Sequence, residues 1–328
     1  MRSLAELTTL RVGGTPNSLV VVTSESEIID AVSANPNALV LGGGSNVIVS
    51  DDFNGDVIKI ESIGFENDES ACAGAWVTVA AGHDWNDFVT SAVTNGWTGI
   101  EGLAGIPGTV GATPIQNVGA YGQSVSDTIA QVRAWNKKTK SVDTIFAADC
   151  EFGYRTSIFK SAPDTWVILS VTFQLPLGTM SAPIAYNELA AKLNVEIGDR
   201  VSTSKLQSAV LELRSGKGMV LDSTDHDTWS VGSFFMNPRV VVAPENAPNW
   251  PEADGLVKVS AAWLIEQAGF NKGFTLNGRA ALSSKHTLAI TNRGSAKSAD
   301  ISELAVHIVQ GVKAKFDIEL KPEATFIS

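Results

Sequence analysis

The chain has 328 residues, of which 44% are hydrophobic and 18% charged, a composition typical of a folded protein with two or three domains. Its formal net charge of −11 argues against nucleic acid or an anionic membrane as the main partner. Cys72 and Cys150 lie far apart, which predicts two buried free thiols rather than a disulfide or a metal site. No stretch reaches the ~20 apolar residues of a membrane span and no signal peptide is evident, so we expect a cytoplasmic protein.

The first predicted elements form a βαβ unit. Residues 19–22 are an apolar strand, Ser24 and Glu27 have the spacing of a helix capping box, and residues 38–41 form the next strand. The stretch 41–46, Leu-Gly-Gly-Gly-Ser-Asn, then leads into another strand. A Rossmann phosphate loop instead runs from a strand into a helix, whose N-terminus faces the pyrophosphate. The order strand, glycine turn, strand therefore disfavours a Rossmann NAD-binding fold.

The next predicted elements surround a second glycine-rich stretch. They are a strand at 76–80, a helix capped by Asp84 and ended by Gly96, and strands at 128–135, 142–146 and 166–175. Between this helix and the later strands, glycine occupies every third position from 99 to 111, and residues 114–122 follow. Glycine lets main-chain amides approach a ligand without an intervening Cβ. We therefore interpret 41–46 and 99–122 as two loops that supply backbone N–H groups to an anion, and so much glycine favours a pyrophosphate. Ordinary tight turns would also explain 42–44.

Near residue 200 the pattern changes to a smaller α+β region. Helices are predicted at 204–214 and after the capping residues Ser260 and Ser298, while 215–230 is expected to be a mobile loop because it is rich in Gly, Asp and Ser. The predicted domains are 1–200, with subdomains 1–65 and 66–200, then 201–315, and finally 316–328, which contains a strand that returns to the active site.

Four segments, in their order and spacing, resemble a known family. They are 41–46, 152–160 (Phe-Gly-Tyr-Arg-Thr-Ser-Ile-Phe-Lys), 232–238 (Gly-Ser-Phe-Phe-Met-Asn-Pro) and 320–326 (Leu-Lys-Pro-Glu-Ala-Thr-Phe). The family is that of the UDP-N-acetylenolpyruvoylglucosamine reductases, flavoenzymes of peptidoglycan precursor synthesis, and the similarity is to the subgroup with a tyrosine-bearing loop. The resemblance implies an α+β protein with a vanillyl-alcohol-oxidase-like two-part FAD-binding fold and a smaller C-terminal α+β substrate domain.

The resemblance also implies FAD as the cofactor and NADPH as the co-substrate. Some proteins of this fold attach FAD through a histidine in the first loop, but 41–46 contains neither His nor Cys, so we expect non-covalent FAD. The residues predicted to bind FAD are Leu41, Gly42, Gly43, Gly44, Ser45, Asn46, Gly105, Ile106, Pro107, Gly108, Gly111, Ala112, Asn117, Gly119, Ala120, Tyr121 and Gly122.

Three residues are predicted to be catalytic because of the resemblance. Arg155 and Glu323 match the pair that polarises the substrate carboxylate and stabilises the enolate-like intermediate, and Ser233 matches the residue that protonates it. An arginine fork suits a carboxylate, and Glu323 would have to hold or share a proton. Without the resemblance, Arg155 would be read as a surface or ion-paired arginine, Glu323 as a solvated carboxylate and Ser233 as a core or turn residue.

The predicted substrate-binding residues are Tyr186, Arg214, Lys217, Asn237 and His286. Tyr186 resembles the clamping tyrosine of the subgroup, although a half-buried aromatic before a helix is nearly as good an interpretation. Lys217 and Asn237 match positions near the substrate diphosphate, with a longer loop between Lys217 and Ser233 than in enterobacterial members. His286 is read as substrate-side or structural. The histidines show no metal-ligand spacing, so no metal is expected.

The resemblance therefore predicts NADPH-dependent reduction of UDP-N-acetylglucosamine enolpyruvate to UDP-N-acetylmuramate through FAD. The expected partners are the UDP-sugar and NADPH, and we expect a monomer, with a dimer as the alternative. One rival is another FAD-dependent oxidoreductase of this fold that acts on a hydroxy acid or sugar lactone, but it does not explain Ser233 together with Glu323. The other rival is a catalytically silent sugar-nucleotide sensor, which would be expected to lose Arg155, Ser233 or Glu323.

Overall fold

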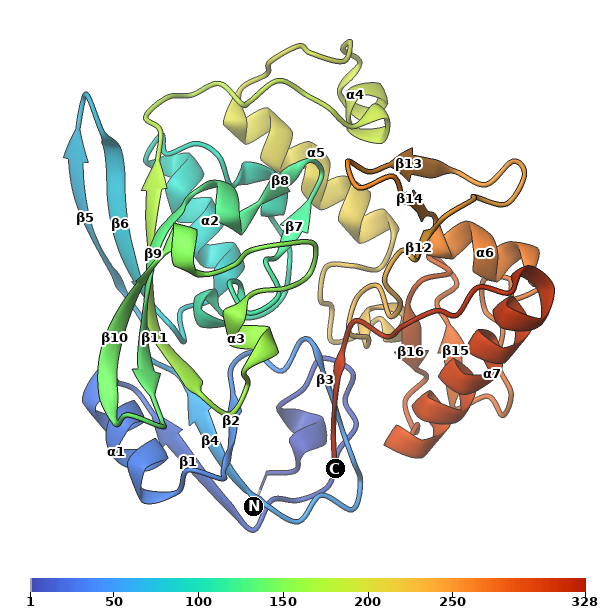
Figure 1. Cartoon of the computed structure of the whole chain (residues 1–328), viewed down its shortest axis with the longest axis horizontal. Coiled ribbons are helices and arrows are strands. Elements are labelled where there is room, and N and C mark those ends of the chain that lie inside the picture. The colour runs from blue at the N-terminus through green and yellow to red at the C-terminus, as the bar shows by residue number, and fades with distance from the viewer. Residues whose placement is uncertain (1) are drawn as a thin grey trace. The chain divides into compact units, whose positions relative to one another are not determined.

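The computed structural model describes residues 2–328 and divides them into two compact units. Unit 1 consists of the residues up to Pro16, Gly44–Asn54 and Gly216–Ser328, and unit 2 consists of Asn17–Gly43 and Gly55–Ser215 (Figure 1). Met1, where the predicted first domain begins, lies outside the described residues. Residues 44–54, which were assigned to the FAD-binding region from the sequence, therefore cluster with the C-terminal part of the chain.

Unit 2 begins with a three-stranded parallel sheet of order β1-β4-β2. The strands are β1 (Ser18–Val22), β4 (Asp56–Ile60) and β2 (Leu39–Leu41). Helix α1 (Glu25–Ala34) links β1 to β2 and buries Ile28 and Val32 in the core of the unit. Ser24 caps this helix as predicted by accepting the Glu27 N–H at 3.3 Å, but the Glu27 carboxylate accepts the N–H of Thr23 at 2.7 Å. The second half of the predicted capping box is therefore shifted by one residue.

A five-stranded antiparallel sheet forms the larger part of unit 2. Its order is β10-β9-β11-β6-β5, with β10 (Ser141–Phe146), β9 (Ile129–Asn136), β11 (Trp166–Leu175), β6 (Gly74–Ala80) and β5 (Phe65–Ser70). Helix α2 (Trp85–Thr94) is capped by the Asp84 side chain, as predicted. Its Phe88 ring packs against Phe173 of β11 with centroids 5.1 Å apart, and Trp85 packs there at 5.9 Å. These aromatic contacts hold α2, and the glycine-rich stretch that follows it, against the sheet.

Short elements complete unit 2. They are the hairpin β7 (Gly119–Ala120) and β8 (Gln123–Ser124), and the helices α3 (Ile158–Ser161), α4 (Asn187–Leu193) and α5 (Thr203–Gly216). The hairpin turns through Tyr121 and Gly122, whose φ angles are 51° and 85°. Two left-handed residues are what a tight two-residue hairpin loop requires. Leu206 and Val210 of α5 lie in the core of unit 2, so this helix packs with the preceding residues rather than with those after 216.

Unit 1 combines small sheets with two helices. The strand pairs are β3 (Val47–Val49) with β17 (Thr325–Ile327) and β15 (Ala280–Leu282) with β16 (Ile290–Asn292), and a third sheet has the order β12 (Arg239–Val240), β14 (Val257–Val259), β13 (Asn249–Pro251). Helices α6 (Ala261–Gln267) and α7 (Ser298–Phe316) contribute Leu264, Ile301 and Ile308 to its core. The C-terminal strand β17 runs parallel to β3, which directly follows the first glycine turn.

The helix ends in unit 1 agree only in part with the sequence prediction. Ser260 caps α6, as predicted, by accepting the N–H of Trp263 at 3.3 Å. Ser298 is instead the first residue of α7, and Lys297 occupies the N-cap position. The Ser298 N–H and hydroxyl both donate to the Asp51 carboxylate, at 2.8 and 2.7 Å. A carboxylate that is distant in the sequence therefore supplies the contact that we had assigned to the serine itself.

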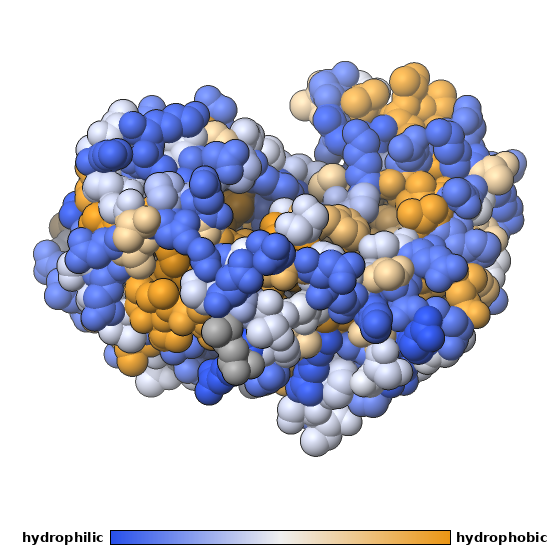
Figure 2. All heavy atoms as spheres, turned by 90° about the horizontal axis from the view of Figure 1, so that it is seen from below, coloured by the Kyte–Doolittle hydropathy of each residue, from blue (hydrophilic) through white to orange (hydrophobic). Residues whose placement is uncertain are grey.

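The surface of the protein mixes hydrophilic and apolar residues. Figure 2 shows one face, on which apolar atoms lie among a larger hydrophilic area. Val20 and Val21 of the edge strand β1 leave 46% and 47% of their surface exposed. No helix within residues 2–328 combines the length and the apolar character that crossing a membrane would require.

Candidate active site

The two loops predicted to hold FAD contact each other within unit 2. A Cβ on Gly43 would lie 2.5 Å from the Gly108 Cα, and a Cβ on Gly42 would lie 2.6 Å from the Thr109 Oγ1. Real Cβ atoms do not approach other atoms so closely, so only glycine lets the turn after β2 lie against 108–109. The glycines at 42 and 43 are therefore explained by the packing of the two loops against each other, and the FAD contacts of these loops stay a prediction.

Lys59 of β4 supports this turn and was missed by the sequence analysis. Its Nζ donates a hydrogen bond to the carbonyl oxygen of Gly42. Burial lowers the pKa of Lys59, while the negative charge of Glu61 acts in the opposite direction. The only signal in the sequence was a lysine inside the apolar strand Asp-Val-Ile-Lys-Ile, and this pattern does not indicate which backbone group the lysine would contact.

Part of the second loop already bonds to the rest of the protein. The Gly111 N–H donates to the Ala81 carbonyl at 2.8 Å, and a Cβ on Gly111 would lie 2.6 Å from the Ala81 Cβ. The Gly105 N–H donates to the Asn86 Oδ1 at 2.7 Å, and the Ala112 N–H closes a tight turn at 3.0 Å. Because these three N–H groups are already hydrogen-bonded, any FAD contacts of Gly105, Gly111 and Ala112 would have to involve atoms other than their amide nitrogens. Packing accounts for some of the glycine density that we had attributed to a ligand.

Arg155 lies beside two residues that were predicted to bind the cofactor. Its Nη2 donates to the Gly119 carbonyl at 2.9 Å and its Nη1 to the Asn117 carbonyl at 3.5 Å. The side-chain amide of Asn117 in turn donates to the Gly153 carbonyl at 3.1 Å, which joins the segment around residue 117 to the segment that carries Arg155. Arg155 has a left-handed φ of 54°, an uncommon conformation for a residue with a long side chain. The tertiary structure therefore holds this guanidinium in a defined orientation.

Three further predicted residues form a cluster in unit 2. The rings of Tyr121 and Tyr186 meet edge to face, with centroids 5.8 Å apart. Burial raises the pKa of Tyr121, and the positive charge of Arg214 opposes that rise. Burial lowers the pKa of Arg214 to about 10, and Tyr121 opposes that fall. A residue predicted to bind the cofactor thus contacts one residue predicted to bind the substrate, Tyr186, and interacts electrostatically with another, Arg214.

Within unit 1, the structure brings the segments of Ser233 and Glu323 together. The Glu323 N–H donates to the Phe234 carbonyl at 2.8 Å, and the Met236 N–H donates to the Lys321 carbonyl at 3.0 Å. The two segments therefore pair in an antiparallel manner. Two residues later, the Thr325 N–H donates to the Asn46 carbonyl at 3.0 Å. The C-terminal segment thus joins the first glycine-rich stretch to the Ser233 segment, and its return to an active site stays a prediction.

The remaining predicted residues have different surroundings. The Asn237 Oδ1 accepts the Ala261 N–H at 2.9 Å, so this side chain fixes the start of α6. His286 lies in a turn in which its N–H donates to the Ser283 hydroxyl at 3.3 Å, two residues before Leu288, whose carbonyl accepts the Phe234 N–H. Lys217 belongs to unit 1, directly after α5.

Arg155 and Glu323 belong to different units, so their joint action on one carboxylate stays a prediction. Both cysteines are free, as predicted, but only Cys150 is buried; Cys72 is exposed, so the prediction of two buried thiols was wrong for it. Burial raises the pKa of Cys150 to about 12, which keeps it protonated. The part of the chain that the structure describes contains no group of three or more His, Cys, Asp or Glu side chains that could hold a metal ion.

Comparisons with known proteins agree with this geometry. Residues 16–144 match the model of an FAD binding domain, and residues 223–327 match the C-terminal domain of UDP-N-acetylenolpyruvoylglucosamine reductase. A protein named UDP-N-acetylenolpyruvoylglucosamine reductase from Cutibacterium acnes is 50% identical, over 99% of this chain and 89% of its own length. A protein of the same name from Salinispora arenicola is 46% identical, over 99% of this chain and 94% of its own length. The crystal structure of such a reductase from Thermus caldophilus aligns with a TM-score of 0.70 and 23% identity, and covers 100% of this chain and 98% of that one. The predicted α+β fold class is confirmed.

Proposed function

Because this chain belongs to the UDP-N-acetylenolpyruvoylglucosamine reductase family, we propose that it reduces UDP-N-acetylglucosamine enolpyruvate to UDP-N-acetylmuramate, with NADPH as the reductant. This is an oxidoreductase reaction with FAD as cofactor, and it supplies a precursor of peptidoglycan. The chain covers most of the length of its relatives, so their printed activity can be proposed for the whole protein.

FAD, when bound, would supply the redox step by accepting a hydride from NADPH and returning it to C3 of the enolpyruvyl group. The residues of the protein then have to stabilise the negative charge that develops on the substrate and to donate one proton to it. As the C3–H bond forms, the electron pair of the double bond moves toward C2 and the carboxylate. We assign Arg155 and Glu323 to that carboxylate and the Ser233 hydroxyl to the proton that C2 receives.

One observation carries this proposal further than the family resemblance does. The hydrogen bond from the Glu323 N–H to the Phe234 carbonyl, at 2.8 Å, joins the segments of two predicted catalytic residues. Gly232, immediately before Ser233, has a left-handed φ of 77°, which glycine tolerates readily. A hydroxyl and a carboxyl group on two paired segments are a suitable arrangement for donating a proton beside an enolate.

Nucleotide binding is assigned by the same reasoning. We propose that FAD contacts the backbone of 42–46 and 105–108, where several glycines leave main-chain groups without a Cβ beside them, and that it is bound without a covalent link. The cluster of Tyr121, Tyr186 and Arg214 supports a role for the last two in gripping the substrate. A monomer in the cytoplasm stays the expected state.

The absorbance spectrum of the purified protein tests the proposed function. We expect flavin bands that bleach when NADPH is added without oxygen and recover when the enolpyruvyl sugar nucleotide is added. Acid precipitation should release all the flavin from the polypeptide. Recovery with a hydroxy acid's oxidised product, but not with the sugar nucleotide, would favour the rival oxidoreductase, and a protein without flavin would favour the sensor.

A further inference from the structure

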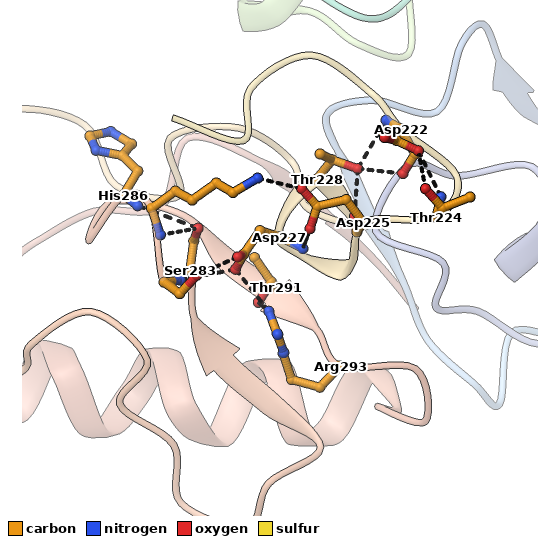
Figure 3. Close-up of polar contacts among 11 residues, drawn as sticks. Asp222, Thr224, Asp225, Asp227, Thr228, Ser283, His286, Thr291 and Arg293 are labelled. Carbon is orange, nitrogen blue, oxygen red and sulfur yellow. Dashed lines mark hydrogen bonds and ion pairs between the residues drawn. The ribbon is translucent and has the colours of Figure 1, made fainter. Parts of the chain in front are cut away.

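The loop between Lys217 and Ser233 is bonded to the rest of unit 1 by carboxylates. Most of it lies within 215–230, which was expected to be mobile, and its polar contacts are drawn in Figure 3. The loop first bonds to itself, because the Thr228 hydroxyl donates to the Asp222 carbonyl at 2.7 Å and accepts the Asp222 N–H at 3.0 Å. These two bonds close residues 222–228 into a compact turn.

Asp227 attaches this turn to a second segment. Its carboxylate accepts the Ser284 N–H at 2.9 Å, the Ser284 hydroxyl at 2.5 Å and the Arg293 Nη1 at 2.8 Å (Figure 3). The side chain is buried, with 7% of its surface exposed. Burial alone would raise the pKa of Asp227, but the bonds from Ser284 and the charge of Arg293 outweigh it, so the pKa is lowered. The carboxylate is therefore ionised and fully engaged at neutral pH.

A weaker contact lies beside it. The Asp225 carboxylate accepts a hydrogen bond from the Lys285 Nζ at 2.5 Å, but about a third of each side chain is exposed, so this ion pair contributes little by itself. The Asp227 carboxylate is buried, so water could not take the place of its hydrogen-bond partners as it could for the more exposed Asp225. Removing it would leave Arg293 and the Ser284 amide without their shared acceptor.

The segment that Asp227 holds is the same one that supports Ser233. After Asp227, the Trp229 carbonyl accepts the Asn292 N–H at 3.0 Å, and Ser230 forms an isolated bridge with Thr291. Beyond Ser233, the Phe234 N–H donates to the Leu288 carbonyl at 2.7 Å. The residues before and after Ser233 are thus hydrogen-bonded to 288–292. Asp227 bonds to Ser284, before that stretch, and to Arg293, directly after it.

We propose that Asp227 is a positioning residue for Ser233, and that the longer loop serves to bring this carboxylate to residues 284–293. Asp227 acts through the backbone of 228–234 and takes no part in the proton transfer itself. The inference rests on the proposed function, since it gives Asp227 a purpose only if the Ser233 hydroxyl is the proton donor.

The test compares Asp227→Ala and Asp227→Asn with Asp300→Asn as a matched control. Asp300 lies in the same unit, is 6% exposed and binds Arg279 at 2.6 Å, but it fixes the start of α7. We expect Asp227→Ala to slow flavin reoxidation by the enolpyruvyl sugar nucleotide by about 10²-fold, the scale of a ~1 Å misplacement of a reacting group. Reduction by NADPH should be unchanged. Asp227→Asn should lose less, because its amide can still bond to Ser284, and Asp300→Asn should reoxidise normally.

Two further measurements separate positioning from a general structural effect. Amide hydrogen exchange in 228–236 should become faster in Asp227→Ala than in the wild type or Asp300→Asn. When Asp227→Ala is combined with Ser233→Ala, reoxidation should be no slower than in Ser233→Ala alone, because a residue that acts through Ser233 has nothing left to position.

Additive losses in the double variant, unchanged exchange in 228–236, or normal reoxidation of Asp227→Ala beside an active wild type would each overturn the positioning role. Equal losses in Asp227→Ala and Asp300→Asn would also overturn it, since they would show a general loss of stability. A wild-type protein that the sugar nucleotide does not reoxidise would refute the proposed function instead, and hydrogen exchange would still report whether Asp227 holds the loop.

Discussion

Unit 2 and unit 1 hold their candidate residues by different means. In unit 2, the glycine turn rests on the backbone of 108–109, and Arg155 is oriented by two main-chain carbonyls. In unit 1, Ser233 and Glu323 lie on short paired segments, and the nearby loop is attached through the carboxylate of Asp227. Unit 2 should therefore be sensitive to added atoms, whereas unit 1 should be sensitive to lost hydrogen bonds and charges.

The largest effect is expected at Ser233. Ser233→Ala should slow flavin reoxidation by the substrate by ~10²–10⁴, the usual cost of losing a positioned proton donor, while NADPH reduces the flavin at the normal rate. Ser233→Cys should keep more activity because a thiol can still donate a proton. Stopped-flow absorbance measures both half-reactions. Equal slowing of the two would make Ser233 a structural residue and would weaken the contrast between the units.

Glu323 should show the next largest effect. Glu323→Ala should slow reoxidation by about 10²–10³, as expected when one donor to a developing oxyanion is lost. Glu323→Gln should lose less because its amide can still donate a hydrogen bond. Affinity of the oxidised enzyme for substrate should change far less than the rate, since the contact strengthens as charge develops. Losses that appear mainly in the dissociation constant would instead make Glu323 a ground-state contact.

Gly43 tests the claim that unit 2 is sensitive to added atoms. In Gly43→Ala the new Cβ would meet the Gly108 Cα at 2.5 Å, a backbone atom that cannot turn away. We expect a loss of about 1–3 kcal/mol in unfolding free energy, the usual cost of overpacking, and weaker retention of FAD on dialysis. Gly178→Ala is the matched control, because its new Cβ would lie 3.7 Å from the Thr98 Cγ2, an ordinary van der Waals contact. Similar results for both variants would contradict the close-packing argument.

The smallest effect concerns pH and the carboxylates of unit 1. The pKa of Asp227 is lowered in the folded protein, so its stabilising contribution is present above the unfolded value of about 4 and is lost as the pH falls through the folded value. Asp227→Asn should therefore be less stable at neutral pH by about 1–2 kcal/mol, and the difference from the wild type should shrink toward pH 3. Urea unfolding at several pH values measures this. A constant difference would mean that the charge of Asp227 adds nothing.

Most helices and strands of unit 2 could be predicted from the sequence. In unit 1, α6, α7, β3 and β17 were predicted, but the short strands β12 to β16 were not. The helices at 85–94 and 261–267 each begin directly after a capping residue, Asp84 and Ser260, and each shows a helical spacing of apolar residues. Both signals are local in the sequence. Strands β4 and β5 were missed: β4 contains the charged Lys59, and β5 is Phe-Glu-Asn-Asp-Glu-Ser, which has almost no apolar alternation. β5 forms only because it pairs along its whole length with β6, a contact that local composition does not indicate.

The sequence alone determined the family, the fold class and the candidate residues, because motifs such as 41–46 and 232–238 are local and can be read in order. Only the tertiary structure decided which residues meet. It brought Lys59 to the Gly42 carbonyl, returned the C-terminal strand to β3, and attached the loop that we expected to be mobile to residues 284–293 through Asp227. These contacts join residues far apart in the chain. Their energies depend on burial and on distances that no spacing in the sequence encodes.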